Sequence, residues 1–125
     1  EPVEQRAIAG LGAGKSNAAT DLLIQISRND ANPRMRSQAL GSLSRKRDPK
    51  AVDAIQSAVK NDADLAVRRR AVSALQALPD GAGVPLLIDT ARNSPDPDVR
   101  KQAVSCLSAT RDPRVSAFFM ELLKK

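Results

Sequence analysis

The apolar residues of this chain recur at the spacing of amphipathic helices. Between Val67 and Leu75 they occupy positions 67, 71, 72 and 75, which share one face of a helix. Val3, Met35, Val67 and Val99 lie 32 residues apart and begin the segments VEQRAIAGLG, MRSQALGSLS, VRRRAVSALQ and VRKQAVSCLS. The chain is therefore predicted to repeat one structural unit four times, and each of these segments is predicted to be the first helix of its unit.

A second apolar stripe predicts another helix in every unit. In the third unit this stripe consists of Val84, Leu87 and Ala91. Its counterparts are Val52, Ile55 and Val59 in the second unit, and Leu22, Leu23 and Ile26 in the first. In the last unit the bulkier Phe118, Phe119, Leu122 and Leu123 suit a helix that closes the core.

Helix-capping residues separate these segments. Asn32-Pro33, Asp64-Leu65 and Asp96-Pro97 precede the first helices, and Asp48-Pro49, Asp80-Gly81 and Asp112-Pro113 precede the second helices. Asn and Asp side chains accept hydrogen bonds from the first turn of a helix, and proline is tolerated at its first position. The second helices are predicted to end at Asn29, Asn61 and Asn93, because Asn tolerates the left-handed conformation common at helix ends.

The motif D-x-x-V-R-x-x-A, with an apolar residue next and Leu three residues later, occurs at Asp64–Leu75 and Asp96–Leu107. It resembles the HEAT-repeat family, most closely the short HEAT-like repeats of phycobilin lyases, and the resemblance covers the whole chain. It implies an all-α fold, a right-handed α-solenoid of four two-helix HEAT-like repeats that bury one another's apolar stripes. Glu4 and Met35 depart from the motif at its Arg and Val positions.

The units span about 1–32, 33–64, 65–96 and 97–125 and form a single HEAT-like domain over residues 1–125. Glu1 falls inside the first predicted helix with no capping residue before it. We therefore expect the domain to be a segment of a longer protein.

One arginine recurs in the first helix of three units, as Arg36, Arg68 and Arg100. By helical angle these side chains point into the apolar stripe, where a guanidinium needs an acidic partner. The nearest recurring acids are the turn aspartates Asp48, Asp64, Asp80, Asp96 and Asp112. We expect a structural ladder between units; the alternative is a row of anion-binding sites, which is less favoured because buried charges are usually paired.

The composition offers little for catalysis. The chain has no His, Tyr or Trp and a single Cys, so catalytic triads, His- or Cys-rich zinc sites and His-based acid–base catalysis lack their side chains. Cys106 shares its column with the small residues Gly10, Ser42 and Ala74, which favours a packed, unreactive thiol over a nucleophile or pigment attachment point. We expect no enzymatic activity, no cofactor and no metal ion.

The net charge of +6 raises nucleic acid as an alternative partner. The basic residues that would line one edge of the solenoid at its turns are Arg45, Lys46, Arg47, Lys50, Arg111 and Arg114. This edge could contact phosphates, as in the HEAT-like DNA glycosylases. Aromatic residues make up only 2% of the chain, so the side chains that hold an extruded base are missing.

The second helices line the concave side of HEAT-type arrays, so the resemblance places a partner there. The candidate residues on this face are Asp53, Gln56, Lys60, Ile88, Asp89, Arg92, Met120, Glu121 and Lys124. Their mixture of charged and aliphatic side chains suits a protein or peptide better than a polyphosphate. The basic column of Arg28, Lys60, Arg92 and Lys124 is also explained by compensation of helix dipoles, which we favour over ligand binding. A phycobilin-lyase role ranks third, because no pigment pocket is evident.

No apolar run is long enough to span a membrane, and the chain does not start with a signal-peptide pattern. We therefore expect a soluble domain without membrane insertion, cytoplasmic rather than periplasmic.

Overall fold

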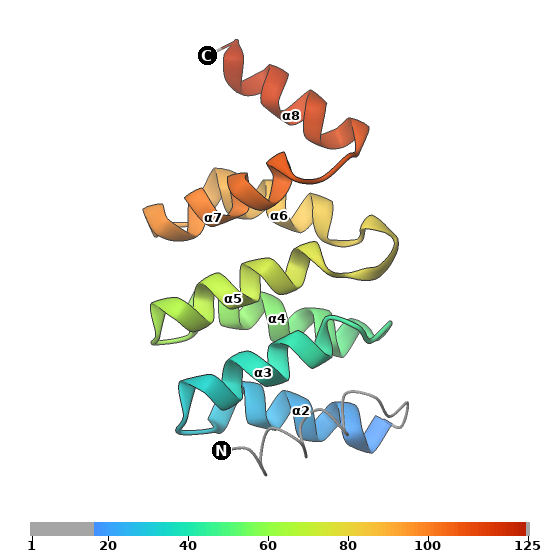
Figure 1. Ribbon diagram of the computed structural model, residues 1–125, viewed down its shortest axis with the longest axis vertical. Coiled ribbons are helices and arrows are strands. Elements are labelled where there is room, and N and C mark those ends of the chain that lie inside the picture. The colour runs from blue at the N-terminus through green and yellow to red at the C-terminus, as the bar shows by residue number, and fades with distance from the viewer. Residues whose placement is uncertain (1–16, 125) are drawn as a thin grey trace.

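The computed structural model describes residues 17–124. Its α-helices are α2 (Asn17–Asn29), α3 (Pro33–Leu43), α4 (Pro49–Asn61), α5 (Leu65–Gln76), α6 (Gly83–Asn93), α7 (Pro97–Ser108) and α8 (Pro113–Leu123), with a short 3-10 helix, η1 (Pro79–Gly81), before α6. These helices stack along one axis from α2 to α8, with no strand in this range (Figure 1). The predicted all-α solenoid of helix pairs is confirmed, while Val3–Gly12 and its Glu4 lie outside the described residues.

The helices are stacked in two sets. The first helices α3, α5 and α7 pack in succession, and each also packs against the second helix that precedes it in the chain. Among the second helices, α2 packs against α4 and α6 packs against α8, but α4 and α6 barely touch. The array is therefore tight along its first helices and open between α4 and α6.

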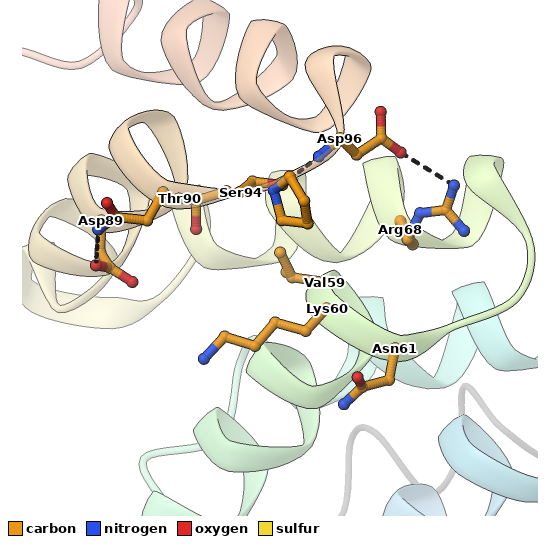
Figure 2. A pocket seen from close by; sticks show the side chains of 10 residues that line it. Val59, Lys60, Asn61, Arg68, Asp89, Thr90, Ser94 and Asp96 are labelled. Carbon is orange, nitrogen blue, oxygen red and sulfur yellow. Dashed lines mark hydrogen bonds and ion pairs between the residues drawn. The ribbon is translucent and has the colours of Figure 1, made fainter.

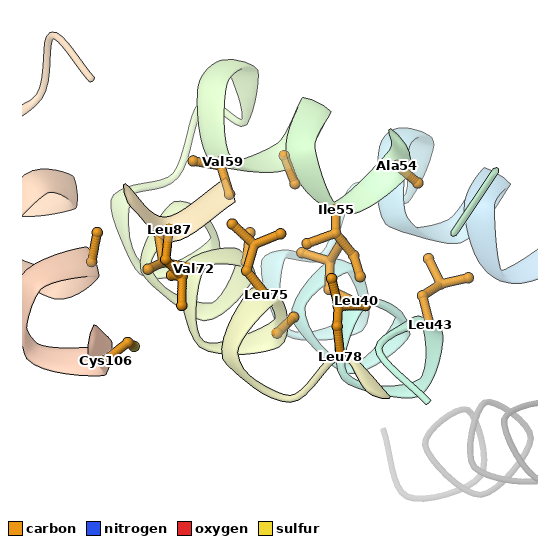
Figure 3. Close-up of a cluster of buried hydrophobic side chains, with 14 of the residues drawn as sticks. Leu40, Leu43, Ala54, Ile55, Val59, Val72, Leu75, Leu78, Leu87 and Cys106 are labelled. Atoms are coloured by element: carbon orange, nitrogen blue, oxygen red, sulfur yellow. The ribbon is translucent and has the colours of Figure 1, made fainter. Parts of the chain in front are cut away.

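The core is built from aliphatic side chains that interdigitate between these layers (Figure 3). The stripe predicted at Val67, Ala71, Val72 and Leu75 is buried. Ile55 and Leu87 of the second helices are buried in the same cluster, and Cys106 lies at its edge. Each unit thus covers the apolar stripe of its neighbour, which an isolated helix pair could not do.

The apolar stripe assigned to α2 was wrong at Leu22. In α2 the buried positions are Ala19, Thr20, Leu23, Ile24 and Ser27, whereas Leu22 is exposed. Ser27 is accommodated because its hydroxyl donates to the Ile24 carbonyl oxygen at 2.7 Å. This internal bond satisfies a polar group at a position that Val59 fills one unit later.

The last helix, α8, closes the core only with its first turns, where Phe118 is buried and Phe119 packs against the core. Only Val115 and Phe118 of this helix are buried, and Leu123 is 81% exposed. The bulky residues at its C-terminal end therefore face solvent in this structure.

The helix caps follow the sequence with one exception. Asn32, Asp48, Asp64, Asp96 and Asp112 each accept a hydrogen bond from a backbone N–H of the first helical turn. The exception is Asp80, which was expected to cap α6 but lies inside η1 with a φ of 60°. The second helices end at their predicted asparagines, but none of these is left-handed; the next residues after α4 and α6 are extended instead.

Candidate functional site

A groove opens between α4 and α6, on the face that we call the second-helix face, meaning the exposed sides of α2, α4, α6 and α8. Its volume is about 610 Å³. The residues lining it are Val59, Lys60, Asn61, Arg68, Asp89, Thr90, Asn93, Ser94, Pro95 and Asp96. Figure 2 shows the C-terminal end of α4 on one side of this α4–α6 groove and the turn between α6 and α7 on the other.

The connection from α5 to α6 differs from those of the neighbouring units. After α5 the chain makes the η1 turn, in which Asp80 and Gly81 have φ values of 60° and 70°, and α6 starts only at Gly83. Gly83 passes so close to the end of α5 that a Cβ there would lie 1.7 Å from the Leu75 carbonyl oxygen. This turn replaces the Asp-Pro cap that precedes α4 and α8, and α6 therefore starts later in the 32-residue register than they do.

A second hollow, of about 450 Å³, lies at the opposite end of α4 and α6. It is lined by Arg47 in the turn before α4, by Asp53 in the first turns of α4, and by the η1 turn, including Asp80. One hollow therefore lies between the N-terminal ends of α4 and α6, and the α4–α6 groove lies between their C-terminal ends. The corresponding hollow between the C-terminal ends of α2 and α4 measures only about 190 Å³.

Polar interactions fix both ends of the α4–α6 groove. At one end the Nη2 of Arg68 donates to a carboxylate oxygen of Asp96 at 3.0 Å (Figure 2). At the other, the side-chain amide of Asn93 donates to Asp89 at 2.7 Å. Between them Val59 and Pro95 supply apolar surface, and Lys60 brings a positive charge. The groove can therefore take up an apolar side chain that is flanked by polar groups.

The nine residues expected to bind a partner do not all gather in this groove. Those that are exposed are Asp53, Lys60, Asp89, Arg92, Met120, Glu121 and Lys124, whereas Gln56 and Ile88 are half-buried. Lys60 and Asp89 line the α4–α6 groove, and Asp53 lines the hollows at the N-terminal end of α4. Gln56, Ile88 and Arg92 lie on α4 and α6 outside the groove, and Met120, Glu121 and Lys124 lie on or directly after α8.

Arg92 has partners within the chain. Its guanidinium forms an ion pair with Glu121 on α8 and lies over the ring of Phe118, 5.1 Å from the ring centroid. These contacts hold α6 and α8 together. They also reduce the charge that Arg92 and Glu121 offer to a ligand.

The recurring arginines Arg36, Arg68 and Arg100 do not all pair with the aspartates expected for them. Arg36 pairs with Asp62, and its Nη1 donates to the Asp30 carbonyl oxygen at 2.8 Å. Arg68 pairs with Asp96 and donates to the Asp62 carbonyl oxygen at 2.7 Å. Arg100 donates to the carbonyl oxygen of Ser94 at 2.6 Å. Every one of these arginines therefore binds the turn six residues before it.

The remaining aspartates of the expected ladder have other tasks. Asp48, Asp64 and Asp112 are helix caps, so their carboxylates face backbone N–H groups of their own helices. Asp80 forms an exposed ion pair with Arg47. Of the expected acids only Asp96 meets the arginine column.

The basic edge at the turns carries internal contacts. Arg47 pairs with Asp80 of the next unit, and Arg114 donates to its own Asp112 and to the Gly81 carbonyl oxygen at 3.2 Å. The Arg114 side chain and its backbone N–H lower the pKa of Asp112 to about 2. The other residues proposed for this edge are Arg45, Lys46, Lys50 and Arg111, of which Lys46 is half-buried and the rest are exposed.

Cys106 is buried and its pKa is raised by that burial. Its sulfur lies 3.9 Å from the side-chain amide nitrogen of Gln102. This amide is a neutral group and not a base that could take the thiol proton to form a thiolate. Among residues 17–124 no three Cys, Asp or Glu side chains cluster in a way that could hold a metal ion. In the same range, no helix combines the length and the apolar character needed to cross a bilayer.

Sequence reasoning missed the residues that shape the α4–α6 groove, namely Thr90, Ser94 and Pro95. A signal was present, because Asp30 and Asp62 occupy the column in which Ser94 stands. The departure from the repeat at Ser94, like that at Gly83, falls in the third unit. Ser94 lines the groove, whereas Gly83 begins α6 at the other end of that helix.

Two overlapping segments of the chain match the family model for HEAT repeats. They are residues 1–76 and 54–125, which together span the chain. This model describes HEAT repeats in general and does not distinguish the phycobilin-lyase type. A search of curated proteins gives no match. HEAT repeats generally mediate protein–protein interactions. The repeated helix pairs and this match show that the chain belongs to the HEAT-repeat family.

Proposed function

We propose that the chain is a non-catalytic protein-interaction module that binds a protein partner on its second-helix face. The observation that carries this proposal is the α4–α6 groove of about 610 Å³, with apolar surface from Val59 and Pro95 and charges from Lys60 and Asp89. A groove of this composition suits side chains of a protein, which combine apolar and polar contacts.

The alternative, nucleic-acid binding along the basic edge, is less favoured. Arg47 and Arg114 use their guanidinium groups for contacts that join neighbouring units. Phosphate binding would have to compete with those contacts. We therefore treat nucleic acid as an outcome to be tested.

Site-specific photocrosslinking tests the proposed face. A benzophenone amino acid replaces Asp89 or Met120 on the second-helix face, or Lys101 or Ser105 on α7 as controls; all four positions are exposed. The variants are irradiated in an extract of the source organism. We expect the same protein adduct from positions 89 and 120 and none from 101 and 105.

Charge reversal provides an independent arm of the same experiment. The Lys60→Glu/Arg92→Glu variant should weaken formation of that adduct, with circular dichroism confirming that the helices are retained. Adducts that arise equally from all four positions, or only from α7, would contradict the proposal.

A further inference from the structure

A row of positive charges runs along the second-helix face, one in each unit. Arg28, Lys60 and Arg92 lie in the last turns of α2, α4 and α6, and Lys124 follows α8. All four side chains are exposed. We call these four residues the basic row. Dipole compensation accounts for a positive charge in each last turn, but it leaves open what the side-chain ends contact.

Three members of the basic row, Arg28, Lys60 and Lys124, have no counter-charge within residues 17–124. Arg28 and Lys60 form no ion pair or side-chain hydrogen bond with any other residue in 17–124, whereas Arg92 pairs with Glu121. Lys60 lines the α4–α6 groove. Arg28 lines the hollow of about 190 Å³ between the C-terminal ends of α2 and α4, and also a second hollow between these helices, of about 380 Å³. Each of these two charges thus borders a hollow that a ligand can enter.

The acids nearby leave the C-terminal ends of α2 and α4 positive. Glu121 is paired with Arg92, whereas Asp89 keeps its negative charge and lines the groove from α6. Asp21 and Asp53 share a hollow with Arg28, but they lie seven residues before Arg28 and Lys60, which is about 10 Å along a helix. The C-terminal part of the second-helix face is therefore positive around α2 and α4.

The geometry points to the occupant, and this step rests on the function proposed above. We propose that the basic row binds an extended acidic segment of the partner protein, with an apolar side chain of that segment in the α4–α6 groove. Packed helices lie roughly 8–10 Å apart and an extended chain advances about 3.3 Å per residue. Acidic residues about three positions apart therefore match Arg28 and Lys60.

The α4–α6 groove then selects the type of residue that comes after the acids in the partner. Beyond Lys60 the next second helix is α6, which barely touches α4, and the space between them holds about 610 Å³ lined in part by Val59 and Pro95. A Leu or Met side chain is stabilised on this apolar surface by leaving water, whereas a further carboxylate would be repelled by Asp89, which also lines the groove. The recognised pattern is two acids followed by an apolar residue.

The same charges could attract a single-stranded nucleic acid, but the observations favour a peptide. Nucleic-acid grooves of this kind stack bases on aromatic side chains. The chain has only Phe118 and Phe119, both in α8, and neither lines the α4–α6 groove. The groove offers aliphatic surface instead.

Fluorescence anisotropy with the full chain tests the proposal. The probe is a synthetic peptide with aspartate at every third position and one leucine after the second aspartate, and the reference peptide carries asparagine in place of aspartate. We expect the acidic peptide to bind and to weaken with salt, and the reference peptide to bind roughly tenfold more weakly or not at all.

Matched variants locate the site. Arg28→Glu/Lys60→Glu should lower affinity for the acidic peptide by roughly tenfold or more. Arg69→Glu/Lys101→Glu makes the same change of charge on exposed residues of α5 and α7 and should leave affinity within about twofold. Circular dichroism and thermal unfolding check that both variants remain folded.

The outcomes separate the possibilities. Equal losses in the two double variants, no binding of the acidic peptide at low salt, or equal binding of the reference peptide would overturn the proposal. Tight binding of oligothymidylate that Arg28→Glu/Lys60→Glu abolishes, without peptide binding, would assign the row to nucleic acid instead. If the crosslinks from positions 89 and 120 persist while the acidic peptide fails to bind, the proposed function stands and only this inference fails.

Discussion

Arg36 and Asp62 form a two-point ion pair that joins the first helix of a unit to the turn after its second helix. The Nε and Nη2 of Arg36 donate to the two carboxylate oxygens of Asp62 at 2.9 and 3.1 Å. The side chains are only 13% and 6% exposed. Hydrogen bonding to Asp62 raises the pKa of Arg36, so the guanidinium stays charged at any pH at which the protein is folded.

Replacement of Arg36 should therefore be costly. Arg36→Met leaves the Asp62 carboxylate almost buried without a cation, and we expect the free energy of unfolding to fall by about 3 kcal/mol. Arg68→Met should cost less, because the Arg68–Asp96 pair is 22% and 25% exposed and has a single contact at 3.0 Å. Urea unfolding of the two variants measures both values. Equal losses would show that burial of the pair does not set its contribution.

The arginine ladder shows where sequence reasoning succeeded and where it stopped. The apolar spacing identified the column of Arg36 and Arg68, and charge burial implied acidic partners. The sequence did not show whether Asp62 or Asp64 is the acidic partner of the arginine, because both stand in the same turn. The structure shows the reason: Asp64 turns its carboxylate onto the N–H groups of Ala66 and Val67, which leaves Asp62 to face the arginine.

The α4–α6 groove was hidden from the sequence for a different reason. The 32-residue register continues through the third unit, so Asp80-Gly81 looked equivalent to Asp48-Pro49. The chain keeps its length there but makes an extra turn and starts α6 later. The spacing of apolar residues in the sequence predicts the helices and their buried faces. The distance between two second helices depends instead on how the turn before them is folded in three dimensions.

Two glycines should respond in opposite directions to alanine. A Cβ at Gly83 would meet the Leu75 carbonyl oxygen at 1.7 Å, so Gly83→Ala should displace α6 and cost about 1–3 kcal/mol or more. A Cβ at Gly41, inside α3, would meet only the movable end of the Arg70 side chain. Gly41→Ala should therefore stabilise by roughly 0.5–1 kcal/mol through its helix propensity. Thermal unfolding compares the two, and a stabilised Gly83→Ala would refute the close approach.

Acid should weaken the cap of α8. The pKa of Asp112 is lowered to about 2 by hydrogen bonds from Arg114, while an unfolded aspartate has a pKa of about 3.9. The ionised cap therefore contributes its full stability above about pH 4 and loses it as the pH falls towards about 2. Asp112→Asn retains a capping oxygen but cannot titrate.

Thermal unfolding between about pH 2 and 5 measures this contribution. The melting temperature of Asp112→Asn should fall less steeply with acid than that of the parent chain. Asp98→Asn, which removes a carboxylate from the first turn of α7, controls for the change in net charge. Identical acid profiles for the parent chain and Asp112→Asn would show that the Arg114 contact contributes nothing.

Cys106 should react slowly in the folded chain. Its side chain is buried and burial raises its pKa, so little thiolate is present near neutral pH. Alkylation by iodoacetamide should be roughly a hundredfold slower in native buffer than in concentrated urea, because it requires local opening. Mass spectrometry follows the labelled fraction over time. Native labelling at the rate of an unfolded thiol would instead indicate an accessible, activated cysteine.

Ser94 provides a test that links the ladder to the α4–α6 groove. It occupies the column of Asp30 and Asp62, and its hydroxyl oxygen accepts from the Asp96 N–H at 3.3 Å. Ser94→Asp should restore the arrangement of Asp62, supply Arg68 with a second carboxylate, and stabilise the chain by about 0.5–1 kcal/mol. The same change adds a carboxylate to the groove that Lys60 also lines, so affinity for the acidic peptide should fall. Ser94→Asn has nearly the same shape without the charge and should leave peptide affinity unchanged. An acidic ligand that lies against the groove must be repelled by a negative charge placed in the groove wall. If both variants bind the acidic peptide as the parent chain does, the groove therefore takes no part in peptide recognition.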